Sequence, residues 1–177
     1  MTISAFDHPI LSSLLSDEEV SRAFSVAANV RAMLAFEAAL AASQAEVGLI
    51  PQAAAARIGE ACAGFSPDMT DLRNGTAKDG VVVPAFIKSL RRSVGPPYAE
   101  KLHLGATSQD VIDTSLVLRL KPLLLSFAAR LEGLIERLRA LEVDQGSVQL
   151  MAHTRMQRAL PITVAEPCSL AKQRMST

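Results

Sequence analysis

The sequence of 177 residues is poor in aromatic residues and cysteine and has no excess of either charge. Aromatic residues make up 4% of the chain, so surfaces that stack nucleic-acid bases are not expected. The 18 basic and 18 acidic residues balance, which removes any long-range attraction to nucleic acid or an anionic membrane. Cys62 and Cys168 are too few for a disulfide framework or a zinc site, and they favour a reducing compartment.

Long apolar runs and common catalytic motifs are also missing. No apolar run approaches the roughly 20 residues that cross a bilayer, and the start MTISAFDHPI does not resemble a signal peptide. Walker, dinucleotide-binding, Cys-x-x-Cys, His-Glu-x-x-His and Gly-x-Ser-x-Gly patterns are absent. The hydrophobic share of 49% excludes a disordered chain. We therefore expect a soluble cytoplasmic protein with no metal site and no nucleic-acid or membrane partner.

Alanine, leucine and valine supply the apolar content, and they recur with the period of a helix. Ser16 and Glu19 have the spacing of a capping box, which predicts a helix over 17–47 that ends before Gly48. Two shorter helices are predicted over 52–62 and 84–94. The period fades over 68–83, where the dipeptides Asn-Gly and Asp-Gly predict a loop. A further break is predicted at Gly95-Pro96-Pro97.

The strongest pattern is a leucine-rich heptad seam. Its members are Leu120, Leu124, Phe127, Leu131, Leu134, Leu138 and Leu141. The seam predicts a helix of roughly 30 residues that begins near Ser108, and Pro122 should kink or weaken it. With no strand candidates, the fold class is all-α: an N-terminal helical domain over 1–106, then the start of a long central helix bundle over 107–177. A one-sided seam needs partner helices, so a homo-oligomer is expected.

Two polar segments could carry chemistry. In the segment 103–110, Thr107 or Ser108 is a natural N-cap, and the free amide groups of a helix N-terminus bind anions. A plain N-cap beside a turn is the alternative. The second segment, 151–163, is dense in hydrogen-bond donors, and Arg155 could hold a carboxylate with both ends of its guanidinium. A solvated connecting loop is the alternative there, and a solvated loop pair is the favoured interpretation of Lys78 and Asp79.

These segments carry a resemblance to the fumarase/aspartase superfamily. HLGATSQDVIDTSLVLRL looks like its first signature, and the second segment is similar to its second signature. The stretches FDHPILSSLLSDEEVSRAFS and AKDGVVVPAFIKSLR, with the wording GATSQDVIDT, most resemble the carboxymuconate-lactonising (cycloisomerase) branch. A match of this extent, from about Phe6 to Ala165, implies the same helical fold.

The resemblance also implies roles for individual residues. Thr107 and Ser108 would hydrogen-bond a substrate carboxylate, and Thr154 and Gln157 match substrate-contacting positions. Arg155 stands where many members place a catalytic histidine. The remaining implied neighbours of the active site are His103 and Lys78.

The implied reaction is a cycloisomerisation of a tricarboxylate, without metal or organic cofactor, in a homotetramer. The catalytic serine of the superfamily belongs to a third signature that this chain lacks, so the chain is expected to be a truncated and catalytically incomplete N-terminal portion. Two alternatives stay open: another lyase of the superfamily, of the succinyl-nucleotide type, and a non-catalytic helical oligomerisation module.

Overall fold

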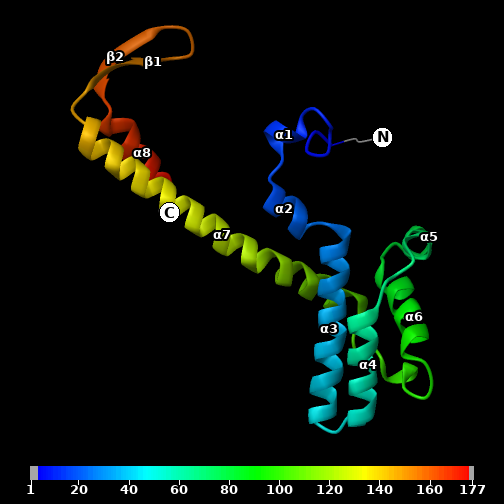
Figure 1. Cartoon of the computed structure of the whole chain (residues 1–177). Helices are drawn as coiled ribbons and strands as arrows, with labels where there is room; N and C mark the ends of the chain where they lie inside the picture. The colour runs from blue at the N-terminus through cyan, green and yellow to red at the C-terminus, as the bar shows by residue number, and fades with distance from the viewer. Residues whose placement is uncertain (1–3, 176–177) are drawn as a thin grey trace. The chain divides into compact units, whose positions relative to one another are not determined.

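The computed structural model describes residues 4–175, which fold into helices and one small hairpin (Figure 1). The chain divides into two compact units, Met1–Leu123 and Leu124–Thr177. One helix, α7, runs through the boundary between them. This division does not test the domain boundary predicted between residues 106 and 107, which stays a prediction. Each unit is described by itself.

The first unit is a set of helices around a hairpin of two long helices. Its elements are α1 (Ser12–Leu15), α2 (Glu18–Ala23), α3 (Val26–Glu46), α4 (Gln52–Gly64), α5 (Met69–Asp79), α6 (Val83–Val94), the 3-10 helix η1 (Ala99–Lys101) and the first turns of α7 (Ser108–Gln145). Helices α3 and α4 lie side by side (Figure 1). Gly48 allows the turn between them because its φ is +76°. Helix α6 packs against α4 and α5.

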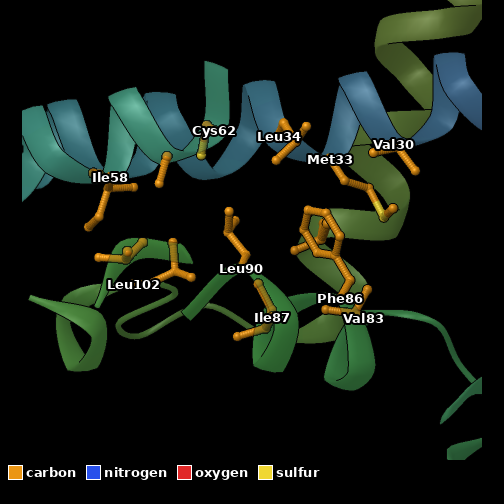
Figure 2. Close-up of a cluster of buried hydrophobic side chains, with 14 of the residues drawn as sticks. Val30, Met33, Leu34, Ile58, Cys62, Val83, Phe86, Ile87, Leu90 and Leu102 are labelled. Carbon is orange, nitrogen blue, oxygen red and sulfur yellow. The ribbon is translucent and has the colours of Figure 1, made fainter. Parts of the chain in front are cut away.

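The core of this unit lies where α6 faces α3 and α4 (Figure 2). Phe86 and Leu90 of α6 are fully buried, as is Ile58 of α4. Met33 of α3 belongs to the same cluster. The Phe86 ring meets Phe65 edge to face, with ring centroids 5.8 Å apart. Few aromatic residues suffice because buried alanines let α3 and α4 approach closely.

The segment predicted as one helix over 17–47 forms two helices, α2 and α3, so the prediction of one continuous helix is wrong. The chain breaks after Phe24, and Ser25 restarts the helix by accepting a hydrogen bond from the Ala28 amide. The predicted capping box at Ser16 is also replaced. Asp17 is the cap instead, since its Oδ1 accepts from the amides of Glu19 and Val20 at 2.9 and 3.1 Å.

The loop predicted over 68–83 is mostly the helix α5, which corrects that prediction. Asp68 caps it by accepting a hydrogen bond from the Thr70 amide at 2.7 Å. The Asn-Gly dipeptide lies inside the helix, where Gly75 lets Ala85 of α6 come close. Only the second dipeptide makes a turn, where Gly80 has a φ of +77°. The helices predicted over 52–62 and 84–94 and the break at Gly95 are confirmed.

The second unit consists of the C-terminal part of α7, the strands β1 (Gln149–His153) and β2 (Arg158–Thr163), and α8 (Ala165–Met175). The antiparallel strands overturn the expectation that the chain has none. An interruption of this helix by Pro167 is the expectation from proline chemistry, and it is wrong, because α8 continues through Pro167. Pro167 lies in the first turn, where a missing amide hydrogen costs no helical bond.

Helix α7 is longer than predicted, with 38 residues, and it continues through Pro122. Most of its seam is exposed, as in Leu124, Leu131 and Leu134. Helix α3 is long and apolar enough to cross a membrane. This is weak evidence for a membrane span, because core helices of soluble proteins pass the same test. Among residues 4–175 no other helix meets that criterion.

Candidate active site

The segment 102–105, just before α7, is held by side chains from two other helices of the first unit. Gln44 of α3 donates to the Leu104 carbonyl at 2.7 Å, and Arg91 of α6 donates to the Leu102 carbonyl at 3.2 Å. These bonds fix an unusual backbone, since His103 has a φ of +61°. A residue other than glycine in this region costs about 1–3 kcal/mol and persists only where its surroundings impose it.

The His103 side chain is paired with a buried acid. Its Nδ1 lies 2.7 Å from Oε1 of Glu37 on α3. The Glu37 side chain is 0% exposed and the His103 side chain 14% exposed. Glu37 also influences Cys62 of α4. Burial, and to a smaller extent the Glu37 charge, raises the pKa of the Cys62 thiol to about 11. The thiol is therefore protonated at neutral pH, as suits its place among the buried core residues.

Helix α7 begins with a reciprocal cap. The amide and Oγ1 of Thr107 donate to Oδ2 of Asp110 at 2.7 and 2.8 Å, and the Asp110 amide donates back to Oγ1. The amide of Thr107, its hydroxyl and the nearby His103 lower the pKa of Asp110. Thr107 thus uses its hydroxyl within the helix start, whereas Ser108 is half-buried beside it.

This cap makes a prediction about pH. Because the pKa of Asp110 is below its ordinary value of 3.8 in the fold, its contribution to stability is complete above that value and is lost as pH falls through the folded pKa. Urea unfolding between about pH 3 and pH 5 should show wild-type stability falling more steeply than that of Asp110→Asn. Asp113→Asn leaves the cap intact and should keep the wild-type slope. Identical slopes for wild type and Asp110→Asn would contradict the assignment.

His103 and Ser108 line one cleft of about 410 Å³ in the first unit. Lys88 and Arg91 of α6 add two cationic groups, and the remaining wall is apolar: Val83, Pro84 and Ile87. Two cationic side chains and a hydroxyl donor around a cleft of this size suit a small carboxylate ligand. Lys88 and Arg91 are not among the residues predicted from the sequence. Pro84, Lys88 and Arg91 are spaced by four and three, which was the signal that they share a helical face.

Lys78 lies in a neighbouring hollow of about 510 Å³, which shares Pro84 and Lys88 with this cleft. Acidic groups are mixed with the basic ones there. Asp71 accepts from Arg92 at 3.0 Å, and Asp79 adjoins Lys78 in sequence. The hollow is therefore less suited to an anion than the cleft at His103.

The other predicted site residues lie in the hairpin of the second unit. Thr154 and Gln157 close its tip, since the Thr154 amide donates to the Gln157 carbonyl at 2.9 Å. Thr154, Arg155 and Gln157 are all exposed, and His153 is paired with Arg158 in the strand ladder. The structure thus brings together His103 and Ser108 in one unit and Thr154 to Gln157 in the other. Within residues 4–175 no group of three His, Cys, Asp or Glu side chains could hold a metal ion.

The chain is similar to known proteins over most of its length. A family model described as lyase matches residues 15–177. The chain belongs to the lyase family. This lyase-family chain is 38% identical over 144 residues to a 3-carboxy-cis,cis-muconate cycloisomerase of Pseudomonas putida, which covers 80% of the chain and 34% of the relative. It is 31% identical over 160 residues to a nitrosuccinate lyase of Streptomyces davaonensis, which covers 89% and 34%.

The fold agrees with that of a solved relative. The crystal structure of a 3-carboxy-cis,cis-muconate lactonizing enzyme from Pseudomonas putida matches with a TM-score of 0.83 and 32% identity, over 96% of this chain and 41% of that one. The resemblance to the lactonising enzymes and the all-α fold class are thereby confirmed. The lyase-family chain spans about a third of the length of the curated relatives that it matches.

Proposed function

We propose that this chain forms the N-terminal part of a 3-carboxy-cis,cis-muconate cycloisomerase and that its cleft binds a carboxylate of the tricarboxylate substrate. The observation that supports this most directly is the cleft itself, where Lys88, Arg91, His103 and Ser108 converge. It is built on the signature-like segment and lies in a chain whose relatives include cycloisomerases. Thr107 supports the site by fixing the start of α7 through Asp110.

In this reaction a carboxylate oxygen of the substrate bonds to one carbon of a double bond. The adjacent carbon becomes a carbanion stabilised by a carboxylate, and it then takes up a proton to leave the lactone. Negative charge accumulates on that carboxylate before the proton arrives. Fixed positive charges and hydrogen-bond donors such as Lys88 and Ser108 stabilise such an intermediate more than the substrate. No metal or organic cofactor takes part in this scheme.

The remaining parts of the proposal concern the whole protein. Thr154, Arg155 and Gln157 would contact substrate from the exposed hairpin tip, and Lys78 would be a more distant neighbour. The catalytic serine would come from a segment outside these 177 residues. The exposed seam of α7 supports a homo-oligomer, a tetramer by analogy with the family, and we place the protein in the cytoplasm.

Two other functions compete with this one. Elimination from a substituted succinate is the second candidate, because relatives include a nitrosuccinate lyase. A non-catalytic helical oligomerisation module is the third, favoured by the exposed leucines of α7. The first two predict carboxylate binding in the cleft, and the third does not.

Calorimetric titration of the full chain with 3-carboxy-cis,cis-muconate tests the proposal. Lys88→Met and Ser108→Ala should each weaken binding, by about tenfold for the lysine, since a hydrogen bond to a charged group contributes about 1.5–3 kcal/mol before screening by solvent. Lys121→Met, which removes an exposed lysine outside the cleft, is the matched control and should bind as wild type does. Equal affinity in all variants would place binding elsewhere. Tighter binding of a substituted succinate would favour the second candidate, and no binding of either compound would favour the third.

A further inference from the structure

The Glu37 carboxyl group is unusual because it is fully buried and its one polar partner among the described residues is His103. Its second oxygen, Oε2, has no hydrogen-bond partner in the part of the chain that the structure describes. Burying a carboxyl group with incomplete hydrogen bonding destabilises a fold, and an apolar residue of similar volume is often as stable or more stable. Stability alone therefore does not account for an acid at this position of α3.

The geometry at His103 gives the acid a different use. The two nitrogens of an imidazole lie on different sides of the ring, and the group bonded to one decides which of them carries the proton. Glu37 occupies the Nδ1 side at 2.7 Å. With Glu37 as a carboxylate, which only accepts hydrogen bonds, the ring donates from Nδ1. Nε2 is then left without a proton in the neutral ring, on a side chain that lines the cleft with Lys88 and Ser108.

The backbone at this point is fixed as well. Gln44, seven residues after Glu37 and two turns along α3, donates to the carbonyl of Leu104. Arg91 donates to the carbonyl of Leu102 on the other side of His103. The imidazole therefore starts from a restrained Cα position, and its hydrogen-bond partner among the described residues is Glu37.

We propose that Glu37 is a positioning residue that holds the His103 imidazole with Nδ1–H toward α3 and Nε2 toward the cleft. Nε2 then faces the carboxylate of a ligand bound in the cleft. It can accept a proton while the ring is neutral, and it donates a hydrogen bond once the ring is protonated. That consequence rests on the function proposed above, whereas the orientation of the ring does not.

Nitrogen NMR of the full chain without ligand tests the orientation. The chain has only 3 histidines, which makes assignment direct. His8 is an internal reference of the opposite kind, since its Nδ1 accepts from the Ile10 amide at 3.2 Å and its proton belongs on Nε2. In the neutral state we expect the proton on Nδ1 for His103 and on Nε2 for His8. A proton on Nε2 of His103 would mean that Glu37 is the donor and would overturn the proposal.

Variants separate positioning from packing. Glu37→Leu should lose the Nδ1 preference of His103 while keeping the helical content, whereas Glu37→Gln, whose amide oxygen still accepts, should restore the preference in part. Glu46→Leu removes an exposed acid from the same helix and should leave the His103 signals unchanged. A preference for Nδ1 that survives in folded Glu37→Leu would overturn the proposal, as would its loss in Glu46→Leu.

Adding 3-carboxy-cis,cis-muconate to the same samples tests the proposed function separately. The Nε2 signal of His103 should shift on titration and the His8 signals should not. If His103 has the expected proton position but does not respond to the tricarboxylate, the function proposed for the cleft fails while the role of Glu37 stands.

Discussion

Phe86→Ala is expected to lower the free energy of unfolding of the first unit by about 3–5 kcal/mol. The Phe86 side chain is fully buried and meets the ring of Phe65. Alanine would remove the apolar contacts of the ring and leave a cavity that rigid neighbours on α3 and α4 fill only in part. The loss exceeds that expected for any exposed position because Phe86 is among the largest fully buried side chains of the described residues.

The composition of the chain supplies a convenient probe for this measurement. The chain has one tyrosine and no tryptophan, so fluorescence reports on Tyr98, which packs against the core of the first unit. Urea unfolding followed by this signal should show a lower midpoint for Phe86→Ala. Phe6→Ala, at a side chain that is 63% exposed, is the matched control and should change stability by less than about 0.5 kcal/mol. A loss below about 1 kcal/mol for Phe86→Ala would show that α6 does not pack as described.

Gly75→Ala should destabilise the first unit by about 1–2 kcal/mol, against the preference of helices for alanine. Helix propensity alone favours alanine over glycine by about 1 kcal/mol. A Cβ at this position, however, would lie well inside van der Waals contact with the Cβ of Ala85 on α6. Overpacking of this kind costs about 1–3 kcal/mol, and the backbone of α6 would have to move to relieve it.

A double-mutant cycle identifies the cause. Ala85→Gly removes the opposing Cβ, so the pair Gly75→Ala and Ala85→Gly should be more stable than the sum of the single changes by about 1 kcal/mol or more. Gly59→Ala is the matched control. Gly59 is helical and nothing lies within 4 Å of an added Cβ, so alanine should be neutral or stabilising by up to about 1 kcal/mol. Simple additivity at positions 75 and 85 would remove the clash as the explanation.

The same glycine explains one of the wrong sequence predictions. In a single sequence, Asn74-Gly75 is indistinguishable from a hairpin turn, because the local signal is the low helix propensity of both residues. The reason for glycine is the nearby α6, which is separated from it by a turn and invisible to local rules. Asp68 was the overlooked clue, since its position predicts the start of α5.

The hairpin was missed for a related reason. Its strands are short and mostly exposed, so they carry no apolar alternation that could identify them. They are stabilised by pairing with each other, as between Leu150 and Ile162, rather than by burial in a core. The candidate residues Thr154, Arg155 and Gln157 were found despite this, from their donor chemistry and from the resemblance to the family.

The sequence by itself determined the features that depend on local periodicity and composition. These are the all-helical class, the helices α4 and α6, the long α7 with its exposed seam, the cap at Thr107, and the family. Only the tertiary structure decided which polar groups meet. Glu37 and His103 are 66 residues apart, and Lys88 and Arg91 have no motif of their own. Their proximity results from how α3, α6 and the start of α7 pack, and packing depends on side-chain shapes from distant parts of the chain.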